Sequence, residues 1–474
     1  MVGEGCESED GTVEEKPDSG RFSEKTRARL DGWRPPLGTL FLVAYAYSSF
    51  APGPLATAVF LVTGATLYAL SVPWASTFHK ALALVSFAML GVVIATGRFD
   101  AAVYSEGLPA YFNVVAVLLV LSIAGYPIRA ARYEAQIRAL MAALTRRGAG
   151  VRTTSGALGH VLGAVLDVGA LVLIDVIAHR AAPHERVEAL TWAGRAFSFA
   201  PLWTNLNVFT ATTITLTGVA YPHLLAVTLP FILVGLAATL FFAQREKGDE
   251  EDPQDPGTPL DRGAAAVLLY PVVLVAAVAL VNLLLPGFPL TAAIAVTVAV
   301  VVLIIACLAA TLLRRISPLG RLVGETRGSL AASHAEFALF GSAGILVLSL
   351  KELGALEPLG ALLSALPPIL VAPALAVTMA VGFVAGIHVI PMILLINTAF
   401  PLGGGPAPAL WAAAILLGSQ AVLLLTPFSS ATTMLSRLTG LHPLEIGPRR
   451  NWGFGLVLML AALAYIGLLT LLLL

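Results

Sequence analysis

The sequence predicts an all-α polytopic membrane protein with about 11 transmembrane helices. Of its 474 residues 58% are hydrophobic and 12% are charged, and the mean hydropathy is +0.87. Most of the apolar stretches have roughly the 17–25 residues that a helix needs to cross the hydrocarbon core. These stretches lie near 37–50, 55–73, 79–97, 110–128, 192–219, 222–243, 263–285, 289–313, 331–350, 409–438 and 452–473. This composition excludes a soluble protein.

The basic residues predict which ends of these spans face the cytoplasm. They cluster at 27–34, 129–152, 245–247, 314–327 and 437–450, and cytoplasmic loops carry the excess of Lys and Arg. One threading puts every cluster inside, with the N-terminus cytoplasmic. Residues 1–35 are polar and lack a signal-peptide pattern, so we expect a disordered cytoplasmic tail. The predicted location is the inner membrane, with the lipid bilayer as a partner.

A repeat with a spacing of 220 residues divides the chain into two halves. Ala211-Thr212-Thr213 returns as Ala431-Thr432-Thr433, and several spans coincide when the first half is shifted by the same amount. We expect the first span and the first repeat over 36–243, and the second repeat over 263–474. The linker between them, 244–262, is acidic and is expected to be cytoplasmic.

The two halves have opposite orientations if each contains five full spans. This count requires 154–180 and 374–400 to be re-entrant hairpins, which enter and leave the membrane on the same side. A full crossing at 154–180 would place the acidic linker and the basic cluster at 314–327 outside the cell, which the charge pattern disfavours. The sequence therefore predicts an inverted-topology repeat, an arrangement common in secondary transporters.

One span in each half contains a polar interruption led by proline. In 192–219 it is Pro201-Leu-Trp-Thr-Asn-Leu-Asn207, and in 409–438 it is Thr426-Pro-Phe-Ser-Ser430. Proline removes a backbone donor and breaks the helix, and freed backbone groups can bind a solute or an ion. Ser and Thr can also simply bond to carbonyls of their own helix. The candidate binding residues are Thr204, Asn205, Asn207, Thr210, Thr426, Ser429, Ser430 and Thr432.

Ionisable and amide side chains inside the apolar stretches supply four further candidates. Asp167 and His388 lie at nearly equivalent places in the two hairpins, and such residues in a membrane segment indicate function because inserting them is costly. Alternatively, Asp167 lies near the interface and His388 is a satisfied core histidine. Gln420 can face the same cavity or bond between helices. Arg195 can attract an anion, or its long side chain can reach the headgroups.

Other kinds of chemistry lack their sequence signatures. There is no GxxxxGK[ST] loop for ATP and no HExxH or CxxC motif, and we expect no cofactor apart from Na⁺ as a possible coupling ion. The two cysteines exclude a disulfide framework. The basic clusters follow the predicted topology, so no nucleic acid is expected as a partner.

The chain resembles the ion transporter superfamily, which includes the divalent anion/Na⁺ symporters and the large membrane subunits of TRAP transporters. The likeness lies in the 11 spans with two hairpins and in two segments, Ala200-Pro-Leu-Trp-Thr-Asn-Leu-Asn-Val-Phe-Thr-Ala-Thr212 and Leu425-Thr-Pro-Phe-Ser-Ser-Ala431. The Ser-Asn-Thr motif of the dicarboxylate symporters is absent as such. The resemblance implies an elevator mechanism and a homodimer, in which a part carrying the hairpins moves against a fixed scaffold.

The predicted function is secondary active transport, not catalysis. We expect a small solute, an organic anion, to move with Na⁺ or H⁺ through a site formed by the two breaks and the hairpin tips. An alternative is a cation/proton antiporter that uses Asp167. A third possibility is a membrane-embedded enzyme or a subunit of a membrane complex, for which Asp167 and His388 would be the candidate catalytic pair.

Overall fold

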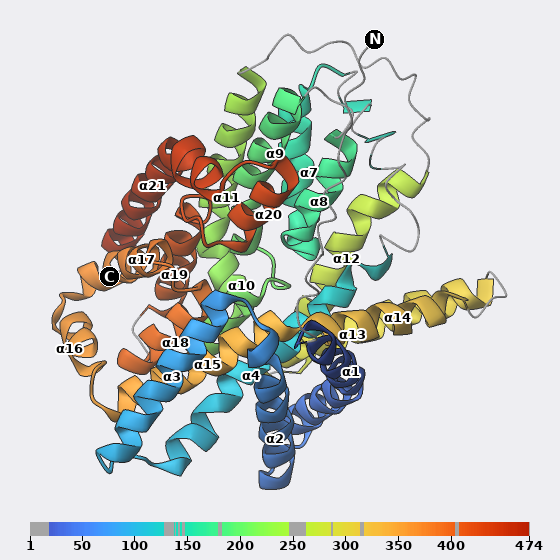
Figure 1. Ribbon diagram of the computed structural model, residues 1–474. Helices are drawn as coiled ribbons and strands as arrows, with labels where there is room; N and C mark the ends of the chain where they lie inside the picture. Colours follow the sequence, from blue (N-terminus) through green and yellow to red (C-terminus); the bar gives the residue numbers. More distant parts are fainter. Residues whose placement is uncertain are drawn as a thin grey trace, which may run out of the picture.

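The computed structural model describes residues 19–127, 147–178, 183–245, 262–285, 288–312, 317–402 and 407–473, with a few positions between 137 and 144. Every regular element in these ranges is helical (Figure 1), which confirms the all-α class. Among the described residues, seven helices are long and apolar enough to cross a membrane: Pro54–Trp74, Thr77–Ala95, Ala101–Ala124, Tyr221–Arg245, Leu290–Thr311, His334–Glu352 and Glu445–Leu473.

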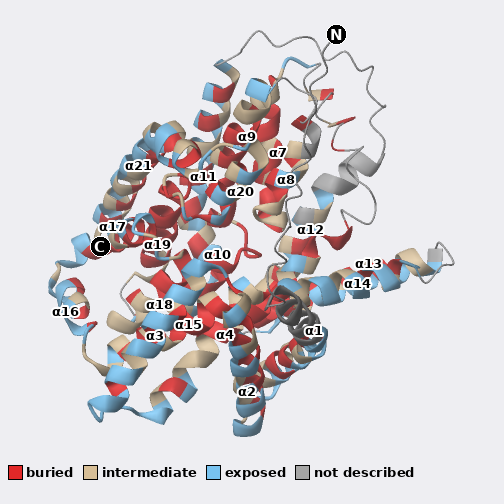
Figure 2. Cartoon of the chain, viewed as in Figure 1, coloured by how far each residue is buried: buried red, intermediate tan, exposed pale blue. Residues whose placement is uncertain are grey.

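The outer helices expose large apolar side chains, as expected for a protein that is surrounded by lipid. Leu84 is 72% exposed and Val457 is 68% exposed, and Figure 2 shows pale blue along much of the outer helices and red toward the middle of the molecule. Exposed apolar surface of this extent is unfavourable in water. The chain is therefore a polytopic membrane protein.

Seven helices form one group, which we call the base helices, in the lower part of Figure 1. They are α1 (Ser19–Phe50), α2 (Pro54–Ser71), α3 (Thr77–Ala95), α4 (Ala101–Ala124), α13 (Leu290–Leu312), α14 (Ser317–Ala332) and α15 (His334–Glu352). α15 packs against α2, α3 and α4. Ser342 joins two of these contacts, because its hydroxyl bonds to Tyr68 at 3.0 Å and its carbonyl accepts from Ser86 at 2.8 Å. Such bonds hold helices together within a membrane.

Ten of the other helices repeat one order in the two halves, and we call them the hairpin helices. The first five are α7 (Val151–Leu166), α8 (Gly169–Ala178), α9 (Pro183–Phe197), α10 (Val208–Thr217) and α11 (Tyr221–Arg245). The second five are α17 (Pro368–Val384), α18 (Val389–Ala399), α19 (Pro408–Ala421), α20 (Ser430–Thr439) and α21 (Arg450–Leu473). Their packing is reciprocal: α10 packs on α18 and α19, and α20 packs on α8 and α9. The predicted inverted repeat would produce such reciprocal packing.

Glycines allow the closest approaches in this group. A Cβ added at Gly418 of α19 would lie 2.2 Å from the carbonyl oxygen of Ala376 in α17, and one at Gly159 of α7 would lie 2.8 Å from that of Ala193 in α9. The helix before each break is therefore packed tightly against the first helix of the hairpin in its own half. These contacts fix where the breaks lie relative to the hairpins.

Some boundaries differ from the sequence prediction. α1 begins at Ser19, so residues 19–35 are helical where we expected a disordered tail, and the predicted span 37–50 is the apolar end of this helix. The basic cluster at 314–327 was expected to be a loop, but α14 covers most of it and buries Pro318, Leu322 and Leu330.

α12 (Arg262–Leu284) runs between the two groups, and α16 (Glu357–Ala365) is a short addition before α17. Of the acidic linker predicted at 244–262, residues 246–261 lie outside the described residues, and its ends belong to α11 and α12.

Candidate functional site

The first break separates α9 from α10 and is held by side chains of its own segment. After the 3₁₀ turn η2 (Ala200–Leu202), Asn207 ends the break as the N-cap of α10, and its Oδ1 accepts from the Phe209 amide at 2.9 Å. The Thr210 hydroxyl donates to the Pro201 carbonyl. Asn207 suits the cap because its side chain supplies an acceptor to free backbone amides, and Pro201 suits the break because it has no backbone N–H to donate. The predicted interruption is confirmed.

Two residues within this break connect it to neighbouring helices. The Thr204 hydroxyl donates to the Ala164 carbonyl of α7 at 2.8 Å, and the Asn205 amide nitrogen donates to the Val275 carbonyl of α12 at 3.2 Å. The Asn205 Oδ1 and the Thr212 hydroxyl are buried without a hydrogen-bond partner. A buried polar atom of this kind is costly unless something binds to it, so these two oxygens are the candidates for contact with a ligand.

The second break has the same construction with different residues. Thr426 accepts from the Phe428 amide at 3.3 Å. Ser429 is the N-cap of α20: its hydroxyl accepts from the Thr432 amide and donates to the Thr432 hydroxyl, both at 3.0 Å. Ser429 thus has the role that Asn207 has in the first half. Ser430 is exposed and begins α20.

A cavity of about 230 Å³ lies where the second break, the tip of the second hairpin and two base helices meet. Its walls come from α3, α15, the hairpin and the break: Phe78, His79, Leu339, Phe383, Gly386, His388, Pro427, Phe428 and Thr433. The hairpin bends sharply at Gly386, whose φ of +95° suits a residue without a Cβ. The structure therefore brings His388 and the second break together, as the sequence predicted.

His388 also connects this cavity to the first half of the chain. Its ring packs edge-on against Phe209 of α10 and Phe340 of α15, with centroids 5.8 and 5.9 Å away. Its Nδ1 is buried without a hydrogen-bond partner, so His388 is not a satisfied core histidine. By contrast, His160 of the first hairpin is satisfied, because it bonds to the Ala196 carbonyl and accepts from the Trp203 indole, both at 3.1 Å.

Asp167 lies at the bend between α7 and α8 and is not among the residues lining this cavity. It is the one described non-glycine residue with positive φ, at φ 51° and ψ −139°. Its carbonyl accepts from the Ala170 amide at 3.0 Å to close the bend. Asp167 and His388 thus do not line one common cavity, and the geometry gives no support to a catalytic pair.

Gln420 lies in the buried part of α19, the helix that packs against both η2 and α10. Its amide nitrogen donates to the Ser419 hydroxyl at 3.4 Å, and its Oε1 is buried without a partner. The amide oxygen of Gln420 therefore resembles the Asn205 amide oxygen and the Thr212 hydroxyl, which are also buried without a hydrogen-bond partner.

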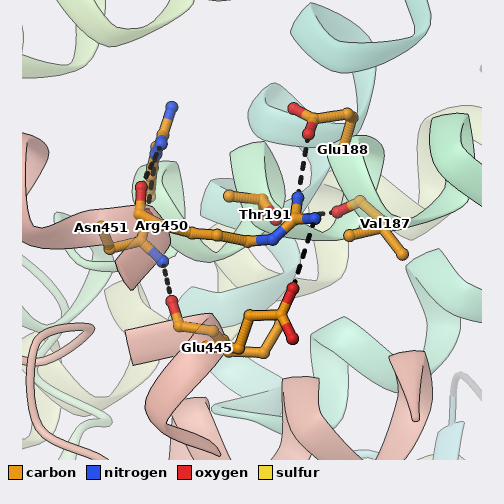
Figure 3. A network of polar contacts seen from close by, with 8 residues as sticks. Val187, Glu188, Thr191, Glu445, Arg450 and Asn451 are labelled. Atoms are coloured by element: carbon orange, nitrogen blue, oxygen red, sulfur yellow. Dashed lines mark hydrogen bonds and ion pairs between the residues drawn. The ribbon is translucent and has the colours of Figure 1, made fainter. Parts of the chain in front are cut away.

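Arg195 takes part in a polar network that joins α9 to the start of α21. Figure 3 shows the part of this network around Glu188, Glu445, Arg450 and Asn451. The Arg195 guanidinium donates to Asn451 Oδ1 at 2.9 Å and to the Arg450 carbonyl at 3.1 Å, and it stacks on Trp192, with its carbon 4.4 Å from the ring centroid. Arg450 in turn donates to Glu188 at 3.1 Å. Arg195 also lines a groove of about 670 Å³ between α9, α11 and α21.

We expect Arg195→Gln to lower stability and leave solute affinity unchanged. The substitution breaks a partly buried network, and each lost hydrogen bond from a charged group costs about 1.5–3 kcal/mol. Thermal unfolding of the purified protein measures the first effect, and a solute titration measures the second. Arg437→Gln, a change at an exposed arginine of α20, is the control. If the variant binds solute more weakly than the wild type and unfolds at the same temperature, Arg195 contributes to solute binding.

Sequence reasoning missed His79, which lines the cavity, and Phe209 and Phe340, whose rings pack against His388. His79 is an ionisable residue at the start of an apolar span, which is a usable signal, but nothing local shows that this end of α3 reaches the hairpin. Within the described parts of the chain, no group of three or more His, Cys, Asp or Glu residues is placed to hold a metal ion.

No family model matches the chain, and neither does any curated protein. Among solved structures, it is similar to the Alcanivorax borkumensis YdaH transporter, whose structure is described as having an unusual topology. The two share 15% sequence identity with a TM-score of 0.49, over 83% of this chain and 97% of that chain.

Proposed function

We propose that this protein is a secondary active transporter that moves a small organic anion across the inner membrane, coupled to Na⁺ or H⁺. The observation that carries the proposal is the cavity between the second break, the hairpin tip and two base helices. A transporter needs a site at bilayer depth where irregular backbone lines a cavity. Here Pro427 and Gly386 supply that backbone, while His388 supplies a polar group.

The two groups of helices are suited to an elevator movement. In this proposal the hairpin helices move, the base helices stay fixed at the interface of a homodimer, and the cavity lies between the two groups. The hairpins re-enter on opposite sides of the membrane, as an inverted repeat requires, and the N-terminus is cytoplasmic. The reciprocal packing of α10 on α18 and of α20 on α8 supports this arrangement.

Flux measurements in proteoliposomes test the proposal. The purified protein is reconstituted, and uptake of labelled carboxylates is followed with a Na⁺ gradient, a pH gradient or neither, with protein-free vesicles as the control. We expect accumulation above the control with one of the two gradients, because a secondary transporter draws its energy from a coupling ion. Equal uptake by protein-containing and protein-free vesicles for all carboxylates would contradict the proposal.

One observation favours a second candidate, a cation/proton antiporter that uses Asp167. The strained backbone at this position places a carboxylate at the tip of the first hairpin, and such strain is concentrated at functional sites. In this case the reconstituted protein exchanges Na⁺ for H⁺ when no organic anion is present. A pH-sensitive dye inside the vesicles distinguishes the two functions.

A further inference from the structure

We infer that the cavity binds a small carboxylate that carries a single charge and an apolar body, and that binding places a proton on His79. The inference rests on the proposed function, because it takes this cavity as the place where the solute lies. It goes further in naming the class of solute and the residue that compensates its charge.

The walls of the cavity fix the class of solute. Its two ionisable lining residues are His79 and His388, and most of the others, such as Phe78, Phe383 and Phe428, are apolar. Imidazole N–H groups can donate to one carboxylate, while the phenyl rings can pack against an apolar body. Beyond the two imidazoles, the remaining polar side chain of the lining is Thr433, whose neutral hydroxyl cannot compensate a second negative charge. A second carboxylate without a compensating charge is unfavourable against these walls, so we expect dicarboxylates to bind more weakly.

The carboxylate requires a compensating charge, since no lysine or arginine is among the lining residues. Other titratable or charged groups on the elements around the cavity are His334, Glu336, Lys80, Lys351, Glu352, Glu357 and Arg437. None of these lines the cavity, and α10, α17 and α18 contain no charged residue. A proton taken up by one imidazole is thus the compensation that the lining residues can supply.

The hydrogen bonds of the two imidazoles show which one takes the proton. A protonated imidazole donates from both nitrogens. The Nδ1 of His388 is buried without a partner, so a proton there would be an unsatisfied buried donor, which is costly. The Nδ1 of His79 lies 2.7 Å from the Ser76 hydroxyl oxygen, which can accept. His79 is therefore the proton acceptor, and His388 binds the carboxylate as a neutral donor.

Calorimetry on the purified full-length protein tests this assignment. Benzoate is titrated in two buffers with different ionisation enthalpies, which counts the protons taken up on binding, and succinate serves as the dicarboxylate probe. We expect the wild type to take up about one proton with benzoate and to bind succinate at least about tenfold more weakly. Raising the pH should weaken benzoate binding.

Substitutions separate the two histidines. His79→Gln should remove the proton uptake and the pH dependence, whereas His388→Gln should weaken benzoate binding about tenfold and keep the proton uptake. His223→Gln, at an exposed position of α11, is the control. The inference is overturned if the wild type does not bind benzoate, binds it without proton uptake, or binds succinate with equal affinity. All three outcomes are measured on the wild type, so they do not depend on whether a variant folds.

The test is independent of flux, so the two proposals can fail separately. Coupled transport by a protein that binds benzoate without proton uptake would overturn this inference alone. Proton-linked benzoate binding by a protein that moves no solute would overturn the proposed function and leave the assignment of the cavity standing.

Discussion

The double substitution Asn205→Ala with Ser429→Ala is expected to abolish coupled solute flux while the protein still folds. Asn205 supplies a buried amide oxygen without a partner in the first break, and Ser429 caps α20 at the second break. The two changes remove the candidate ligand atom from the first break and the N-cap from the second. Loss of a serine cap costs about 0.5–2 kcal/mol, and loss of the Asn205 hydrogen bond to Val275 costs about 1 kcal/mol.

The matched control removes two hydroxyls from the same two helices outside the breaks. Thr215 donates to the Ala211 carbonyl at 2.8 Å within α10, and Ser436 donates to the Leu441 carbonyl at 2.6 Å at the end of α20. Thr215→Ala with Ser436→Ala should have a comparable thermal stability and retain its flux. Uptake is measured in proteoliposomes with equal amounts of protein. Unchanged flux in the Asn205 and Ser429 variant would show that the breaks are not the site.

Local chemistry allowed both breaks to be predicted from the sequence. Pro201 and Pro427 lie within the breaks and have no backbone N–H to donate, so they disfavour a continuous helix there. Asn207 and Ser429 begin the next helix because their side chains accept from free amides. These effects act within a few residues and are the same in any context. The hairpins were predicted differently, from the number of spans and the distribution of basic residues.

Contacts between distant segments were beyond the reach of the sequence. His79 and His388 are separated by most of the chain, and only the packing of α3 and α15 beside the hairpin tip brings both to one cavity. Arg195 shows the opposite case. It precedes the first break closely in sequence, yet its side chain extends to Asn451 at the start of α21. Its position in the sequence suggested a place near the first break, but helix packing directs the Arg195 side chain elsewhere.

The charged segment at 314–327 shows why composition alone misplaces some helices. Its basic residues indicated a cytoplasmic loop, but Leu322 and Leu330 lie on a face of α14 that packs against α1, α4 and α13. An amphipathic helix of this kind is polar over much of its surface and still buries an apolar stripe. The charge pattern therefore did not reveal the helix at 317–332.

Asp167→Asn is expected to uncouple transport from the ion gradient without preventing solute exchange. Asp167 lies outside the cavity that contains the two histidines, so its removal should not affect solute binding there. Its carboxylate is the ionisable group at the tip of the first hairpin, and inserting such a group into a membrane segment is costly enough to indicate a role. We expect gradient-driven accumulation to fall at least about tenfold, which corresponds to about 1.4 kcal/mol of coupling free energy.

Asp167→Gly separates the carboxylate from the backbone strain at the same position. A non-glycine residue in this region of φ and ψ costs about 1–3 kcal/mol, so glycine should raise the thermal stability while losing the same accumulation. Exchange of labelled solute at equal concentrations on both sides should continue in both variants, because it needs the site and not the gradient. If Asp167→Asn accumulates solute as the wild type does, coupling lies elsewhere. If it loses exchange as well, Asp167 belongs to the solute site, and the cavity at the second hairpin would be only half of it.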